Sequence, residues 1–268
     1  MLKDITLGQF FPGNTVAHRL DPRTKILLVM LYIVALFCAK HVVSYGLMAL
    51  TLFACVKISK VRFKTMVKGL KPVVFIVVFT AVLNLFFTPG ERDLVKLGFL
   101  RISDTGLENA IFMVLRILLL IMGTFLMTYT TSPISLTDGL ERLLNGLKRF
   151  RVPVHELAMM MSIALRFIPT LIEETDKIMS AQKARGADFE SGSLIDKAKA
   201  LIPILVPLFI GAFRRADELA TAMECRCYQG GEGRTKMKLL RYTLWDFRAF
   251  GIGALLLIVT FILASVSL

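Results

Sequence analysis

The sequence predicts an all-α integral membrane protein with about five transmembrane helices and three further helices on the cytosolic side. Of its 268 residues, 55% are apolar and only 20% are charged. The apolar residues are concentrated in long runs, and a helix needs roughly 20 of them to cross a bilayer. The net charge of +13 comes from Lys and Arg that cluster in some of the loops, as they do in cytosolic loops of membrane proteins.

Five apolar runs are candidate transmembrane helices. In chain order they are Thr24–Ala39, Val42–Val56, Pro72–Phe87, Leu107–Thr131 and Phe250–Leu268. The first three runs are short, and flanking Lys and Arg side chains extend them by reaching to the membrane surface. The fourth run contains Arg116 near its middle, and an ionisable residue at that depth indicates a buried partner or a functional contact.

The charged loops predict the orientation. The segment 57–71 holds six basic residues and no acidic one, which is a strong cytoplasmic signal. The N-terminus is then cytoplasmic as well, the segment 88–106 lies outside, and the C-terminus ends outside. The first two dozen residues are polar, so we expect no cleavable signal peptide. The predicted domains are a four-helix membrane domain (1–131), a cytosolic domain (132–248) and a C-terminal transmembrane helix (249–268).

The cytosolic domain has the spacing of three helices, at about 135–150, 153–186 and 194–228. The second begins at Pro153, a residue suited to the first helical turn. Apolar residues recur at helical spacing along both long helices, which indicates that each has one apolar face. Pro169, Pro203 and Pro207 lie inside the long helices, and proline inside a helix predicts a kink.

The ends of the two long helices form a weak internal repeat. An offset of 41 residues aligns the segment Asp176–Gly186 with Asp217–Cys227 and places Arg185 opposite Arg226. An Arg in the last turn can bind its own terminal carbonyls, and its guanidinium can still meet a carboxylate on another protein. A single Arg followed by Gly is ordinarily only a helix cap. The repeat at matched positions favours two similar docking sites on a two-part partner.

These motifs resemble those of a known family. The triplets Ala184-Arg185-Gly186 and Cys225-Arg226-Cys227 are similar to the paired Ala-Arg-Gly motifs of the transmembrane T component of energy-coupling factor transporters, the CbiQ/EcfT family. The segments Gly8–Lys25 and Tyr228–Lys236 also resemble that family, so the similarity covers essentially the whole chain. The second triplet departs from the family pattern, because Cys flanks Arg226 on both sides.

The resemblance implies a division of labour between chains. In that family the two motifs end crossed coupling helices, and each docks on one of two ATP-binding-cassette subunits, which hold the ATP and Mg. A separate S component in the bacterial cell membrane binds the vitamin or micronutrient. This chain would be non-catalytic and would bind no cofactor, metal or nucleic acid. The expected S-component contacts are apolar side chains of the long helices, Met160, Met161, Leu165, Leu205 and Phe209.

Three alternatives remain open at this stage. The T component could be dedicated to one substrate, such as cobalt, nickel or biotin. A polytopic membrane enzyme acting on lipids would need clustered acids or His at the ends of the spans, whereas the acids here are scattered. A self-contained secondary transporter would show repeated halves and intramembrane acids. The pair Cys225 and Cys227 is too few ligands for a structural zinc site, which needs four.

Overall fold

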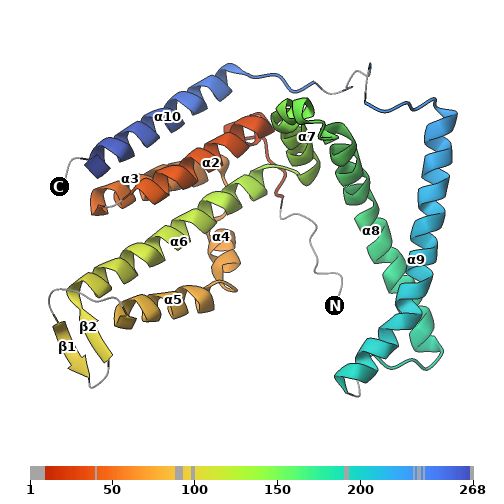
Figure 1. The fold of residues 1–268 in the computed structure, drawn as a ribbon, viewed down its shortest axis with the longest axis horizontal. Coiled ribbons are helices and arrows are strands. Elements are labelled where there is room, and N and C mark those ends of the chain that lie inside the picture. Colours follow the sequence, from red (N-terminus) through yellow and green to blue (C-terminus); the bar gives the residue numbers. More distant parts are fainter. Residues whose placement is uncertain are drawn as a thin grey trace. The chain divides into compact units, whose positions relative to one another are not determined.

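The computed structural model describes residues 10–39, 41–87, 93–97, 100–189, 193–231, 233, 237 and 239–265. Most of these residues are helical (Figure 1). The chain divides into two compact units, one formed by 8–139 with 240–268 and the other by 140–239 with the first seven residues. The domain division predicted above stays a prediction, since a membrane boundary rather than compactness defines it.

The first unit contains the membrane helices. Its elements, in chain order, are α1 (Val16–Arg19), α2 (Pro22–Cys38), α3 (Val42–Ser59), α4 (Phe63–Leu70), α5 (Val74–Phe87), β1 (Asp93–Leu97), β2 (Leu100–Ser103), α6 (Asp104–Thr130) and α10 (Leu244–Ser265). The helix α6 packs against α2, α3 and α5, and α10 packs against α2. Figure 1 shows these helices side by side. The fold class predicted from the sequence, an all-α membrane protein, is confirmed.

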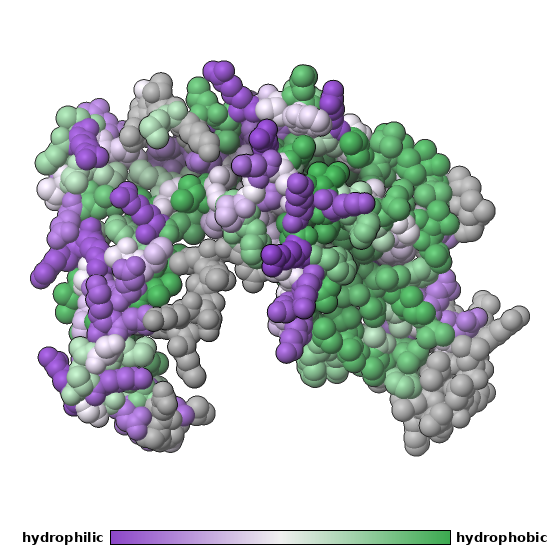
Figure 2. All heavy atoms as spheres, turned by 180° about the vertical axis from the view of Figure 1, so that it is seen from behind, coloured by the Kyte–Doolittle hydropathy of each residue, from purple (hydrophilic) through white to green (hydrophobic). Residues whose placement is uncertain are grey.

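The core of this unit lies between α2, α3 and α6. Its largest fully buried side chains include Leu36, Met48 and Tyr129. Small residues bring the helices close together, because a Cβ on Gly123 would lie 2.8 Å from the Tyr32 ring. Apolar side chains such as Phe75 remain exposed on the outside of the unit. Figure 2 shows that this outer surface is largely hydrophobic, as expected of helices that face lipid.

Length and composition admit four or five membrane-crossing helices among the described residues. Val42–Ser59, 106–130 and Leu244–Ser265 qualify, and α4 with α5 forms a broken span bent by 63°. The helix α2, which contains the first predicted span, is not among them, because it has 17 residues, a length at the lower limit for a span. The same criterion also admits the long helix Val154–Ala184, which the sequence places in the cytosolic domain. The orientation of the N-terminus stays a prediction.

The structure differs from the predicted elements at three places. The segment predicted as a plain outer loop contains an antiparallel hairpin of β1 and β2. The last helix begins at Leu244 rather than Phe250, because the charged residues Asp246 and Arg248 end the apolar run without ending the helix. The predicted helix 135–150 is divided into α7 (Pro133–Leu144) and the 3-10 turn η2 (Asn145–Phe150), where Asn and Gly weaken the α-helix.

A buried polar cluster joins the starts of α2 and α10. The Asp246 side chain is fully buried, and its Oδ1 accepts a hydrogen bond from the Asp21 amide at 2.9 Å. Its Oδ2 accepts from the Thr243 amide and hydroxyl, both at 2.7 Å. Asp21 also pairs with Arg23 at 2.8 Å, and the Arg23 guanidinium lies 4.0 Å from the centre of the Tyr242 ring. Residues 225 positions apart are thereby fixed together.

The second unit consists mainly of two long helices, α8 (Val154–Ala184) and α9 (Leu194–Cys225). Both begin and end within a few residues of the predicted bounds. Each continues through its internal prolines without a break in the helix. The start of α9 is fixed by a capping box, in which the Ser193 and Asp196 side chains bind each other's backbone amides.

Candidate functional site

The first motif forms the end of α8. Here the Gly186 amide donates to the Lys183 carbonyl at 3.0 Å, and the Ala187 amide donates to the Gln182 carbonyl at 3.0 Å. This pair of bonds is the Schellman motif, which satisfies carbonyls that the last helical turn would otherwise leave unpaired. Arg185 occupies the cap position between the helix and the residue that reverses the chain.

The second motif forms the end of α9 in the same way. The Cys227 amide donates to the Glu224 carbonyl at 2.8 Å, and the Tyr228 amide donates to the Met223 carbonyl at 3.0 Å. Arg226 is the cap residue. The repeat found in the sequence is therefore also a repeat of backbone geometry, with the two arginines at equivalent positions.

The residue after each arginine adopts a left-handed backbone conformation. Gly186 has φ +87° and Cys227 has φ +55°. Glycine adopts this conformation freely, whereas a residue with a Cβ is strained by about 1–2 kcal/mol. The Cys227 position is therefore the place where the departure from Ala-Arg-Gly has a physical cost.

Reciprocal substitutions at this position test the cap geometry. Cys227→Gly is expected to stabilise the end of α9 by about 1 kcal/mol, because it removes the left-handed strain. Gly186→Cys is expected to destabilise the end of α8 by a similar amount. Amide hydrogen exchange in the last helical turn should slow about five-fold in the first variant and accelerate about five-fold in the second. Unchanged exchange in both would contradict the assigned caps.

All six motif residues are exposed. Within the part of the chain that the structure describes, neither the Arg185 nor the Arg226 guanidinium forms an ion pair. The two helices run antiparallel. The Gln182 side chain donates from Nε2 to the Pro203 carbonyl at 3.5 Å, and two turns earlier in α8, Glu174 pairs with Arg215 at 2.6 Å. The two arginines therefore lie at opposite ends of the helix pair, as Figure 1 shows for the ends of α8 and α9.

Comparison with known proteins places the chain in a family. It is 57% identical to the energy-coupling factor transporter transmembrane protein EcfT of Thermosediminibacter oceani. The alignment of 249 residues covers 93% of this chain and 94% of the relative. The protein of the same name from Clostridium kluyveri is 55% identical over 267 residues, covering 99% of this chain and 98% of the relative.

The relative of that name from Bacillus subtilis is 50% identical over 243 residues, covering 91% of this chain and 92% of its own length. Residues 13–237 also match the family model CbiQ, described as a cobalt transport protein. The chain belongs to the CbiQ/EcfT family. The resemblance inferred from the arginine motifs is thereby confirmed, and with it the assignment to membrane transport.

A groove that the sequence analysis missed separates α8 from α9 in this CbiQ/EcfT chain. It has a volume of about 310 Å³ and lies between the first half of α8 and the second half of α9. Ile163 and Phe167 line one side, and Ala212 and Ala216 line the other. The sequence contains a signal for this groove, because alanines recur every four residues on α9 as far as Ala220. Residues at this spacing share one face of the helix, and their small side chains leave space there.

The five apolar residues predicted to contact an S component come from both long helices, and this contact stays a prediction. Met160 and Met161 are about half exposed near the start of α8, with Leu165 one turn further along, and Leu205 and Phe209 are exposed in the first half of α9. The start of α9 lies beside the end of α8. At 1.5 Å per residue, the α8 residues are therefore about 20–30 Å from the α9 residues along the helix axis. The structure places these residues in two separate patches.

The intramembrane arginine has defined partners. Arg116 on α6 donates from Nε to the Tyr45 hydroxyl at 2.9 Å and from Nη2 to the Ala39 carbonyl at 3.3 Å. The Tyr45 ring in turn stacks on Phe112. The Ala39 carbonyl lies just beyond the end of α2, so Arg116 satisfies a terminal carbonyl and connects three helices. This explains how the charge is tolerated within a span.

Proposed function

We propose that this chain is the T component of an energy-coupling factor importer. In this role it links ATP hydrolysis by two cytosolic ATP-binding-cassette subunits to uptake of a vitamin or micronutrient through a separate S component. The observation that carries the proposal is the pair of equivalent helix ends, each with an exposed arginine in a Schellman cap. The names of the relatives, energy-coupling factor transporter transmembrane proteins, support it.

The geometry suits mechanical coupling. Each arginine lies at the tip of a helix of more than 30 residues, which spans about 45 Å. If each tip is held by one ATPase subunit, closure of the ATPase pair moves the tips relative to each other, and the packed helices transmit the movement as rigid elements. The crossing point would act as the pivot, because the Glu174–Arg215 ion pair and the Gln182–Pro203 contact hold the helices there.

The chain itself would be non-catalytic, with ATP and Mg on its partners. Its own contribution is positional, since the two tips determine where the ATPases lie and the apolar helix faces remain for the S component. The exposed apolar residues of α9, including Ile202, Leu205 and Phe209, form a continuous helical face. An apolar face of this size on a helix is typical of a protein–protein or membrane contact.

Two native cysteines allow the docking to be tested without disturbing the arginines. Cys225 and Cys227 flank Arg226 and are exposed. In the complex with both ATPase subunits, maleimide labelling of these cysteines should slow at least ten-fold compared with the isolated chain. The Ala184→Cys variant tests the other end in the same way. An Arg214→Cys variant, exposed in the middle of α9, is the control and should keep its labelling rate.

The outcome distinguishes the alternatives. Protection of both ends, without protection of position 214, supports docking at the two tips. Equal labelling of the free and assembled chain at Cys225, at Cys227 and at the thiol introduced by Ala184→Cys would contradict the proposal. Mass spectrometry of the labelled peptides separates these sites from Cys38 and Cys55.

A T component dedicated to one substrate is a second candidate, because the matching family model is described as a cobalt transport protein. We favour the shared type, because the relatives at 50–57% identity have names that specify no substrate. Purification of the tagged chain from its native membrane distinguishes the two. Several different S components in the purified complexes would support shared use, and a single one would support a dedicated system.

A further inference from the structure

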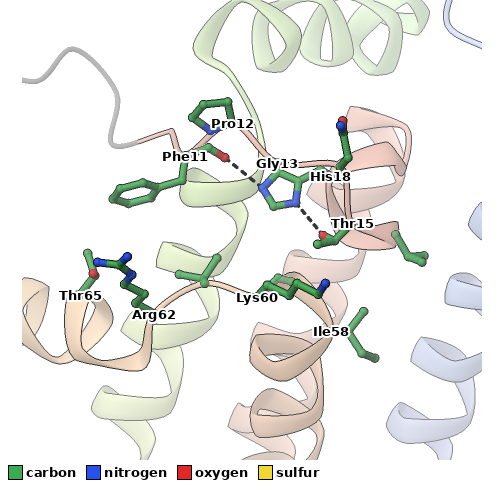
Figure 3. A pocket seen from close by; sticks show the side chains of 13 residues that line it. Phe11, Pro12, Gly13, Thr15, His18, Ile58, Lys60, Arg62 and Thr65 are labelled. Carbon is green, nitrogen blue, oxygen red and sulfur yellow. Dashed lines mark hydrogen bonds between the residues drawn. The ribbon is translucent and has the colours of Figure 1, made fainter.

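A hollow of about 840 Å³ lies between the N-terminal segment and the turn that joins α3 to α4 (Figure 3). Phe11, Gly13 and Thr15 line one side of it, and Lys60 and Arg62 line the other. It lies within the membrane unit and involves none of the residues that the proposed coupling function uses.

The N-terminal side of the hollow is held in place by several contacts. The two ring nitrogens of His18 make hydrogen bonds at 2.7 Å to the Thr15 hydroxyl and at 3.0 Å to the Phe11 carbonyl. The Phe11 amide donates to the Tyr129 carbonyl of α6 at 3.0 Å. A Cβ on Gly13 would lie 2.8 Å from the His18 ring, so this position accepts only glycine without a shift. The N-terminal side of the hollow is therefore preformed.

The charge around the hollow is positive. Among its lining residues Lys60 and Arg62 are basic, and none is Asp or Glu. Both cations are exposed, and Lys60 has a left-handed backbone, φ +55°, that turns the chain between the two helices. Lys64 and Lys68 belong to the same basic segment but do not line the hollow. The arrangement is suited to an anion with oxygen acceptors, such as a phosphate.

The other lining residues are apolar, and several remain uncovered. Ile58 is 55% exposed and Phe11 is 46% exposed. The hollow lies at the end of α3, a candidate span, and therefore at the level where lipid headgroups meet water. Next to it, α4 exposes Phe63 and Val67 beside its lysines, as helices at a membrane surface do. A free phosphate would leave these apolar groups unused, whereas a lipid would contact them with its acyl chains.

We propose that this hollow binds an anionic phospholipid with a glycerol-type headgroup. Figure 3 shows the Arg62 and Lys60 side chains extending in opposite directions along the rim of the hollow, and both turn toward the phosphate when the lipid binds. The headgroup hydroxyls meet the polar groups of Asn14 and Thr15, and the acyl chain runs over Ile58 into the bilayer. Basic pockets beside transmembrane helices recognise anionic headgroups in this manner. The bound lipid would fix the turn between α3 and α4 against the N-terminal segment.

The test uses the full chain in detergent and measures phosphatidylglycerol and phosphatidylcholine binding by native mass spectrometry. The variant Lys60→Asn with Arg62→Gln removes the two lining charges, and Asn suits the left-handed backbone at 60. The matched control, Lys64→Gln with Lys68→Gln, removes two charges from the same segment outside the hollow. The first variant should bind phosphatidylglycerol at least ten-fold more weakly than the native chain, and the control should change binding less than two-fold.

Other outcomes overturn the proposal. An equal loss in both double variants would mean that only general surface charge attracts the lipid. Equal binding of phosphatidylcholine and phosphatidylglycerol by the native chain would remove the role of the anion. Displacement of the lipid by inorganic phosphate would assign the hollow to a small anion instead. Unchanged melting temperatures of both variants would show that neither result comes from unfolding.

Discussion

Uptake by the assembled transporter is expected to fall to background when Arg185→Glu and Arg226→Glu are combined. Each arginine lies at an exposed helix tip, where the proposed partner groups are carboxylates on an ATPase subunit. Reversal replaces an attractive contact by a repulsive one, and an arginine that is a hot spot of an interface contributes about 2 kcal/mol. Either single reversal should therefore weaken ATPase binding by about 30-fold.

The two reversals should act together because the two tips bind one ATPase pair. Loss of one tip leaves the other attached, so the single variants retain part of the complex at high concentration. Loss of both removes the linkage. Co-purification with the tagged ATPases measures binding, and uptake of the labelled substrate into proteoliposomes measures coupling.

The control is Arg214→Glu on the exposed middle of α9. It makes the same change of charge on the same helix but away from the tip, and it should keep both binding and uptake within two-fold. Membrane insertion of all variants should be unchanged, because the tips lie outside the membrane helices. A double variant that still co-purifies with its ATPases and transports at the native rate would refute docking through the arginines.

The sequence was sufficient for the features that depend on local pattern. Apolar runs predicted the membrane helices, and the 3.6-residue spacing predicted α8 and α9 to within a few residues. The aligned arginines predicted two equivalent helix ends, and the shared Schellman caps bear this out at the level of backbone geometry. Such caps form from residues that are neighbours in sequence, which is why they are readable there.

Features that depend on distant residues were not predictable in this way. The sequence marked Arg116 as a buried charge, but its partners Tyr45 and Ala39 come from two other helices. The apolar run predicts a start of α10 at Phe250, because Asp246 and Arg248 interrupt the run before that residue. The buried Asp246 carboxylate has a partner that lies far away in the chain, because it accepts a hydrogen bond from the Asp21 amide.

The predicted S-component residues show a related limit. Helical periodicity identifies which side of a single helix is apolar, but it does not determine how two helices align. The predicted contacts include residues of both helices, and the antiparallel arrangement of α8 and α9 places Met160 and Phe209 in separate patches. The alanine spacing on α9 indicates only one wall of the groove between the helices, because the other wall comes from the opposite half of α8.

Loss of the Asp246 carboxylate is expected to destabilise the membrane unit. Among the polar side chains at the starts of its helices, truncation of this one should have the largest effect. Asp246→Ala leaves the buried Asp21 amide without its acceptor, and it also removes the acceptor of the Thr243 amide and hydroxyl, which lie on an exposed residue. One unsatisfied buried donor costs about 1–3 kcal/mol, so we expect a loss of about 1–3 kcal/mol. Unfolding in mixed micelles with increasing denaturing detergent measures it.

The conservative variant separates the contributions to this effect. Asp246→Asn retains one acceptor oxygen and the side-chain volume, and should lose about half as much stability as Asp246→Ala, because the amide group can satisfy only part of the donor set. Glu108→Ala, an exposed acid on α6, is the control and should change stability by less than about 0.5 kcal/mol. If Asp246→Ala unfolds with the native midpoint, the polar cluster does not hold α2 and α10 together. The cluster joins the start of α2 to the start of α10. Its loss should therefore increase amide hydrogen exchange at the starts of both helices, whereas the cavity left by a truncated side chain would affect only its immediate neighbours.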